Sequence, residues 1–199
     1  MAPQNVTPTL SRRDEILERA AELFAHKGIA GTTVREIGDA VGMLSGSLYH
    51  HFSSKEEIVD AIVSSYLEEL QDAYQLVVDE HDDPTERLIA LVRASFHSVQ
   101  ARPAACEIYQ KELSFLASLP RFAYMTETAE ATQRHWMDTI RAGIVDGRIR
   151  ADVDPAVMYR FLRDAIWMSV RWYHTGGRFS VDELADQFVK IFLEGVLVE

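Results

Sequence analysis

The chain has 199 residues, of which 47% are hydrophobic, and a formal net charge of −11. This length allows one domain or two small ones with a sizeable core. The single cysteine, Cys106, excludes an intramolecular disulfide and a cysteine-rich zinc site. Because the sequence shows neither a run of about 18 apolar residues nor an opening signal peptide, we expect a cytoplasmic protein that does not span a membrane.

The N-terminal part of the sequence predicts a short arm followed by three helices. Residues 1–10 are polar and contain two prolines, which is typical of a disordered arm. The predicted helices cover residues 11–27, 33–42 and 44–51. Each of the first two begins at a serine or threonine that can cap its free N–H groups and stops at a glycine, which enters the left-handed region at no steric cost.

The second and third predicted helices form a helix–turn–helix. Leu48 and Phe52 give the short third helix one apolar seam, which holds it against the helix before it. Its opposite face carries small, polar or hydrogen-bonding residues: Ser45, Gly46, Ser47, Tyr49 and His50. This geometry enters a DNA major groove, so the sequence predicts a DNA-binding domain over residues 11–54. The alternative is that Tyr49 and His51 are ordinary packing residues.

The remaining chain, residues 55–199, predicts a helical bundle that binds a ligand and dimerises. Its expected helices run over residues 55–79, 84–101, 103–118, 120–146, 155–174 and 181–198. Neither a strand pattern nor an internal repeat is visible in the sequence. The predicted fold class is therefore all-α, with about nine helices: three in the N-terminal domain and the remainder in the bundle.

The negative charge lies outside the predicted DNA-binding domain. Residues 1–55 hold six basic and six acidic residues, so the whole charge of −11 belongs to residues 56–199. A neutral DNA-binding end on an acidic body predicts modest non-specific affinity for DNA.

Several residues in and around the helix–turn–helix stand in a specific order and spacing: Thr33, Ile37, Gly42, Leu48-Tyr49, His51-Phe52 and Lys55-Glu56. They resemble the N-terminal domain of the TetR family of bacterial repressors. The resemblance implies a ligand-responsive repressor that binds a palindromic operator as a homodimer. It also implies DNA phosphate contacts from four side chains: Thr33, Tyr49, His51 and Lys55.

The last two predicted helices are apolar on more than one side, so each must be buried on more than one side. We expect them to form the dimer interface, as the TetR resemblance also implies. The residues expected there are Phe161, Tyr173, Phe188, Ile191 and Phe192. A dimer would let two recognition helices reach half-sites about 34 Å apart. The alternative is that both faces fill the core of one subunit.

Arg163, Trp167 and Arg171 are spaced four residues apart and are expected to lie in one column of the helix over 155–174. Two guanidinium groups around an indole favour an anionic ligand with a flat group. Aromatic residues elsewhere could line an apolar end of the same pocket: Tyr109, Phe115, Phe122 and Tyr124. The alternative is that the arginines pair with carboxylates such as Asp164 and pack by their stems.

A narrower resemblance comes from three stretches: 160–177, 47–52 and 109–112. They are similar to TetR-type repressors of actinobacterial steroid catabolism, which govern breakdown of the later cholesterol rings. That resemblance implies release from operator DNA by a coenzyme A thioester of a partly degraded steroid. Coenzyme A would supply phosphates for the two arginines, and a fused-ring acyl group would suit an aromatic cavity.

Other functions find less support in the sequence. One alternative is a TetR-type regulator of efflux or other catabolism that senses a lipophilic small molecule. A different class is a small-molecule-binding helical protein or an enzyme. Because the seven histidines lack metal-ligand spacing and no glycine-rich phosphate loop occurs, we predict neither an enzyme nor a metal or cofactor.

Overall fold

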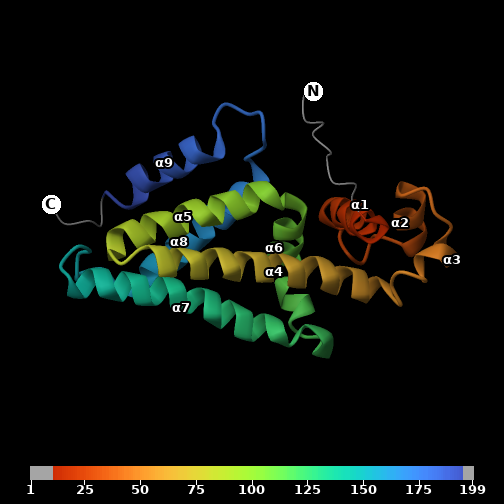
Figure 1. Cartoon of the computed structure of the whole chain (residues 1–199), viewed down its shortest axis with the longest axis horizontal. Helices are drawn as coiled ribbons and strands as arrows, with labels where there is room; N and C mark the ends of the chain where they lie inside the picture. Colours follow the sequence, from red (N-terminus) through yellow and green to blue (C-terminus); the bar gives the residue numbers. More distant parts are fainter. Residues whose placement is uncertain (1–10, 195–199) are drawn as a thin grey trace, which may run out of the picture. The chain divides into compact units, whose positions relative to one another are not determined.

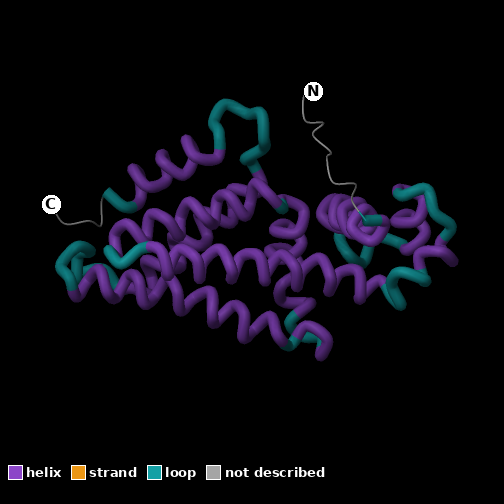
Figure 2. The backbone as a smooth tube through the Cα atoms, in the orientation of Figure 1, coloured by secondary structure: helices purple, strands orange, loops and turns teal. Residues whose placement is uncertain are grey.

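The computed structural model describes residues 11–194, and its regular structure in that range is helical, with no strand (Figures 1 and 2). Within this range there are nine α-helices and two 3₁₀ helices: α1 Arg12–Lys27, α2 Val34–Ala40, α3 Ser45–Leu48, α4 Lys55–Glu80, α5 Pro84–Ala101, α6 Pro103–Leu116, η1 Pro120–Phe122, α7 Tyr124–Val145, α8 Pro155–Trp167, η2 Met168–Arg171 and α9 Val181–Phe192. This confirms the all-α prediction. The arm predicted over residues 1–10 lies outside the described residues.

The chain divides into two compact units between Val63 and Ser64. Helix α4 crosses this division without a break, so its first two turns belong to the first unit and the rest to the second. The boundary expected between residues 54 and 55 stays a prediction. No helix among residues 11–194 is long and apolar enough to cross a membrane.

The first unit has a small core shared by α1, α2, α3 and the start of α4. Its buried apolar residues include Ile16, Phe24, Ile37, Leu48, Phe52, Ile58 and Ile62. Ser11 caps α1, and Gly28 ends it with a positive φ of 79°. The predicted start and stop of this helix are therefore confirmed.

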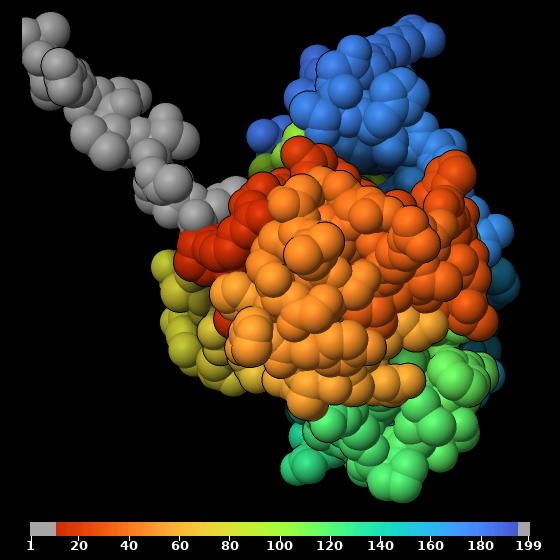
Figure 3. Space-filling model, turned by 90° about the vertical axis from the view of Figure 1, so that its right-hand side faces the viewer, coloured from red at the N-terminus to blue at the C-terminus, as the bar shows by residue number. Residues whose placement is uncertain are grey.

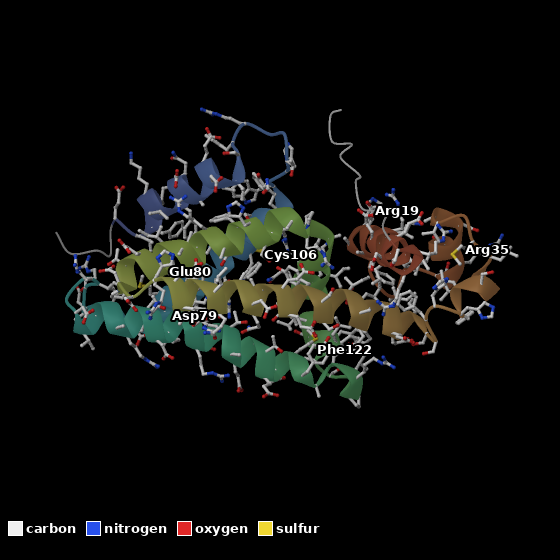
Figure 4. The ribbon with its side chains drawn as sticks, in the orientation of Figure 1. Arg19, Arg35, Asp79, Glu80, Cys106 and Phe122 are labelled. Atoms are coloured by element: carbon white, nitrogen blue, oxygen red, sulfur yellow. The ribbon has the colours of Figure 1, made fainter. Side chains whose placement is uncertain are left out.

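The second unit is built around α5, which packs against α6, α7, α8 and α9. Its interior is rich in aromatic rings, and the ring of Tyr74 meets that of Trp136 edge-on with centroids 6.1 Å apart. On the outside, Arg93–Asp186 (2.6 Å) and His97–Asp182 (2.8 Å) tie α5 to α9. Cys106, labelled in Figure 4, is buried, and burial raises the pKa of its thiol to about 12. The thiol is therefore protonated and inert at neutral pH.

Two helices differ from their predicted ranges: the third is shorter, and the long helix after Pro120 begins later. The third helix, expected over 44–51, is a single turn, Ser45–Leu48, and residues 49–51 follow as a turn. Pro120 does not open the long helix. It begins a 3₁₀ turn closed by Ala123 N–H on its carbonyl (3.3 Å), and α7 starts only at Tyr124.

The C-terminal helices also end sooner than predicted. The helix expected over 155–174 ends at Trp167, because Trp172 and Tyr173 bond back to the carbonyl of Ser169 and tighten the chain into η2. Helix α9 begins under the predicted cap of Ser180 but ends at Phe192. The rest of the range predicted to reach residue 198 lies partly outside the described residues.

Two buried tyrosines of α4 differ in how their hydroxyls are satisfied. The Tyr74 hydroxyl lies 2.6 Å from Ser95 Oγ, which in turn donates to the Leu91 carbonyl at 2.7 Å. The Tyr66 hydroxyl has no hydrogen-bond partner among the described residues, and burial raises its pKa well above the usual range. An unmade buried hydrogen bond costs stability, whereas a made one contributes modestly.

We therefore expect Tyr74→Phe to lower the free energy of unfolding by about 1–2 kcal/mol, because it deletes a made hydrogen bond. Tyr66→Phe should change it by less than about 0.5 kcal/mol or raise it, because it deletes an unpartnered hydroxyl. Urea denaturation of the two variants beside wild type checks this. Equal losses in both variants would contradict it.

Candidate nucleic-acid interface and ligand cavity

The start of α2 is fixed by a reciprocal cap. Thr33 Oγ1 accepts from the Glu36 N–H at 3.2 Å, and the Glu36 carboxylate accepts from the Thr33 N–H at 2.8 Å. Lys27 Nζ donates to the same carboxylate at 2.7 Å. The bond from Lys27 first, and those from Thr33 next, hold the pKa of Glu36 at about 2. Glu36 is thus ionised throughout the neutral range.

The turn between α2 and α3 depends on a close backbone approach. Gly42 adopts φ 66°, and the Met43 N–H donates to the Gly38 carbonyl at 2.8 Å. A Cβ on Gly38 would lie only 2.8 Å from the Met43 carbonyl oxygen, so a side chain there collides with backbone. A Cβ on Gly46, the second residue of α3, would meet no atom of the described chain within 4 Å.

The outer surface of α3 carries the residues predicted to touch DNA. Leu48 and Phe52 are buried, which confirms the apolar seam. The candidate contact residues all retain access to solvent: Ser45 and Ser47 are half-buried, and Gly46, Tyr49, His50 and His51 are exposed. In Figure 3 the orange atoms of the α2–α3 segment and the start of α4 form a continuous surface.

Lys55 already has partners within the first unit. Its Nζ donates to the carbonyls of Ile29 at 2.8 Å and Thr32 at 3.0 Å, which ties the α1–α2 loop to the start of α4. The predicted phosphate contact therefore has one remaining N–H of the ammonium group to use. Arg13 lies over the Phe52 ring at 4.7 Å and supports the same core.

The second unit contains a cavity of about 410 Å³ between α4, α6, α7 and α8. Its lining is Leu67, Leu70, Tyr109, Gln110, Leu113, Ala117, Met125, Thr126, Ala129, Glu130, Thr132, Gln133, Tyr159, Arg163, Asp164 and Trp167. The lining mixes apolar and polar side chains, and the volume falls within the range of small-molecule sites.

The structure brings three predicted ligand residues together at this cavity: Tyr109, Arg163 and Trp167. Phe122 is buried, Phe115 is exposed and Tyr124 is half-buried, and none of the three is in the lining. Arg171 does not continue the predicted column, because α8 ends at Trp167 and Arg171 follows in η2. It is exposed and makes no side-chain hydrogen bond or ion pair within residues 11–194.

Arg163 pairs with Asp164, as the alternative interpretation of the two arginines predicted. Its guanidinium donates to Asp164 at 2.8 Å and lies 5.6 Å from the centroid of the Tyr159 ring. The bond to Asp164 raises the pKa of Arg163 further above its usual value, so the guanidinium is always charged. Sequence reasoning missed Tyr159 as a wall residue, although its position four residues before Arg163 places both on one helix face. It could not find Gln133 or Glu130, which carry no local signal.

An apolar surface lies on α8, η2 and α9. Its exposed members are Val157, Phe161, Met168, Trp172, Ile191 and Phe192. Among the predicted interface residues, Phe188 is buried behind this surface, stacked on Phe192 at 4.4 Å. Tyr173 is half-buried, and its hydroxyl accepts from Gln100 at 3.2 Å. Exposed large apolar side chains in this number are typical of a protein–protein contact.

Models of known protein families match residues in both units of the chain. The family model described as "Bacterial regulatory proteins, tetR family" matches residues 16–62, and "Tetracyclin repressor-like, C-terminal domain" matches residues 81–196. The chain belongs to the TetR family. This confirms the predicted family, whose members are regulators rather than enzymes.

The relatives of this TetR-family chain are named as repressors. It is 42% identical over 196 residues to the "HTH-type transcriptional repressor KstR2" of Mycolicibacterium smegmatis, covering 98% of this chain and 96% of that protein. The solved structure of the "ketosteroid transcriptional regulator KstR2" of Mycobacterium tuberculosis superposes with a TM-score of 0.93 at 43% identity, covering 98% and 100% of the two chains. The chain is thus a TetR-type transcriptional repressor close to KstR2.

A more distant TetR neighbour was solved with both kinds of partner. AibR "in complex with isovaleryl coenzyme A and operator DNA" superposes with a TM-score of 0.77 at 26% identity, covering 92% of this chain and 98% of that one. The response of this TetR-family chain to a coenzyme A thioester stays a prediction.

The two glycines of the helix–turn–helix should separate folding from DNA binding. Gly38→Ala should lower the melting temperature by several degrees despite the better helix propensity of alanine, because the added methyl collides with the Met43 carbonyl. Gly46→Ala should keep or raise the melting temperature, because its methyl would meet open space, and should weaken operator binding if α3 enters the groove as predicted. Thermal unfolding and a DNA titration check this. A stable Gly38→Ala protein would contradict it.

Proposed function

We propose that the chain is a homodimeric repressor of steroid catabolic genes that leaves its operator when it binds a steroid-ring-derived acyl-coenzyme A. The observation that carries the proposal is the similarity to KstR2 over 98% of the chain, combined with a cavity that Arg163 and Trp167 line. Because such a regulator works where the chromosome lies, we place it in the cytoplasm.

DNA recognition is assigned to the exposed surface of α3 and its flanks. Base edges would be read by Ser45, Gly46, Ser47, Tyr49 and His50, and phosphates would be held by Thr33, Tyr49, His51 and Lys55. Phosphate contacts set the register, whereas base contacts set the sequence. Thr33, Gly46, Tyr49, His50 and His51 are exposed, Ser45 and Ser47 are half-buried, and Thr33 would lose only its local bond to Glu36 on turning to DNA.

Dimerisation is assigned to the apolar surface of α8, η2 and α9. Two copies of Phe161 and Ile191, which are 68% and 69% exposed, would be buried when these faces meet. A two-fold axis through this surface would present two α3 helices to a palindrome. Phe188 would support the interface from behind through Phe192.

The acyl part of the ligand is assigned to the cavity. Leu67, Leu70, Leu113 and Met125 supply an apolar side that fits fused rings. A whole coenzyme A thioester is larger than about 410 Å³, so its phosphates would lie outside, beside Arg163, whose side chain is 43% exposed. Arg163 would exchange Asp164 for a ligand oxygen, and charge-assisted bonds of this kind are strong. AibR, which binds isovaleryl coenzyme A, supports this ligand class.

Release from DNA would act through α4. Leu67 and Leu70 of this helix line the cavity, and its first residue, Lys55, is one of the proposed phosphate contacts. A ligand that binds one position of α4 better than another shifts the equilibrium between DNA-competent and released forms.

A second candidate is a TetR-type regulator of efflux that senses a lipophilic cation. The cavity lining includes two carboxylates, Glu130 and Asp164, against the single arginine Arg163. The lining thus carries a net negative charge, which favours a cation.

Fluorescence anisotropy on DNA from upstream of the protein's own gene tests the proposal. We expect a steroid-derived coenzyme A thioester to weaken DNA binding about 5- to 150-fold, and the free acid and coenzyme A alone to have little effect. DNA binding that none of the three releases would overturn the effector assignment. Release by lipophilic cations instead would favour the efflux regulator.

Arg163→Ala should weaken thioester binding about 10- to 100-fold, because it removes a charged hydrogen-bond donor, and should leave DNA binding without ligand within about twofold. The matched control is Arg141→Ala, an exposed arginine of α7 that pairs with Asp138 of its own helix. Isothermal titration calorimetry gives the affinity for the thioester. Equal affinities of the two variants for the thioester would show that Arg163 does not contribute to thioester binding.

A further inference from the structure

Leu44 is an exposed leucine at a position where a leucine brings no local benefit. It lies directly before α3, as the N-cap residue, and is 81% exposed. Its carbonyl accepts from Ser47 N–H at 2.9 Å and Leu48 N–H at 3.3 Å, which any residue could do. Its side chain cannot accept a hydrogen bond.

Several other helices of the described chain begin under a side-chain cap, whereas α6 and α7, like α3, have none. Ser11, Thr33 and Ser180 each accept a backbone N–H at the start of α1, α2 and α9. N-caps strongly prefer such side chains over leucine. The missing cap alone is therefore not unusual. What sets Leu44 apart is its exposure, because Leu44 and Tyr49 are the large hydrophobic residues exposed among residues 11–63.

The surroundings of Leu44 point to DNA as its partner. It is adjacent to Ser45 and Gly46, and a Cβ on Gly46 would meet open space, so the surface beside it can be approached closely. In a helix–turn–helix the first residues of the second helix contact base edges in the major groove. The apolar group that base edges offer there is the C5-methyl of thymine.

We propose that Leu44 is a specificity-determining residue that reads a thymine methyl group in each half-site of the operator. The inference rests on the proposed DNA binding through α3 and adds to it a residue and the chemistry of the base that it contacts. Its contribution is apolar, so it selects thymine over bases that lack the methyl group.

The test compares two operator duplexes: DNA from upstream of the gene, and the same duplex with every thymine replaced by uracil, which lacks only the methyl group. We expect wild type to bind the uracil duplex about 4-fold more weakly for one methyl contact and about 15-fold more weakly for two half-sites. Leu44→Ala should bind both duplexes equally, at about the affinity of wild type for the uracil duplex.

Two further variants separate this role from a structural one. Leu44→Ser should restore a side-chain cap and raise the melting temperature by about 2–4 °C, and should still lose the preference for thymine. Leu76→Ala, which truncates another exposed leucine (56% exposed), should keep the preference.

The outcomes distinguish the inference from the function on which it rests. If wild type binds neither duplex, the proposed DNA binding fails and the inference fails with it. If wild type binds both duplexes equally, or if Leu44→Ala still prefers thymine, DNA binding stands and Leu44 is not the reader. A Leu44→Ala variant that binds DNA normally but loses self-association would assign the residue to a protein contact instead.

Discussion

The fold depends on the continuity of α4, because one helix of 26 residues completes two separate cores. Ile58 and Ile62 close the interior of the first unit, and Leu67 and Leu70 wall the cavity of the second. Between these pairs lies about one turn of helix. Lys55 at its start holds the α1–α2 loop through two carbonyls, so the same helix is tied to the cap of α2.

Within the second unit, polar contacts fix α4 at defined points. Arg102 reaches Ser65 at 3.2 Å and pairs with Glu69, and Gln71 donates to the Thr128 carbonyl at 3.2 Å. Tyr74 bonds Ser95 farther along. The Gln71 contact ends on α7, whose Thr132 lines the cavity and also accepts from Gln71. These polar contacts set the register of α4 against α5 and α7 alongside its apolar packing.

Local sequence signals predicted the starts of several helices. Helix ends and cavity walls depend on long-range packing, which the sequence alone does not reveal. Ser11, Thr33 and Ser180 cap helices as predicted, because caps and left-handed glycines act over four residues. The ends of α3 and α8 were misjudged, because apolar spacing continues through 3₁₀ turns and did not reveal the i→i+3 bonds around Ser169. Part of the cavity was predicted, because Trp167 stands four residues from Arg163 on one helix. Gln133 and Glu130 become part of its wall only when α7 packs beside α4 and α6.

The charges of the first unit leave little for non-specific attraction to DNA. Of the six basic residues among residues 1–55, four are ion-paired: Arg12, Arg19, Lys27 and Arg35. Arg13 lies over an aromatic ring and Lys55 donates to two carbonyls. Phosphate neutralisation supplies most non-specific affinity, and each pair that stays intact removes one cation from it. In the proposed interface, uncharged groups of the α3 surface, namely Tyr49, the serines and the exposed Leu44, would then carry most of the contacts. Such an interface would depend on matching base edges rather than on general attraction to the phosphate backbone.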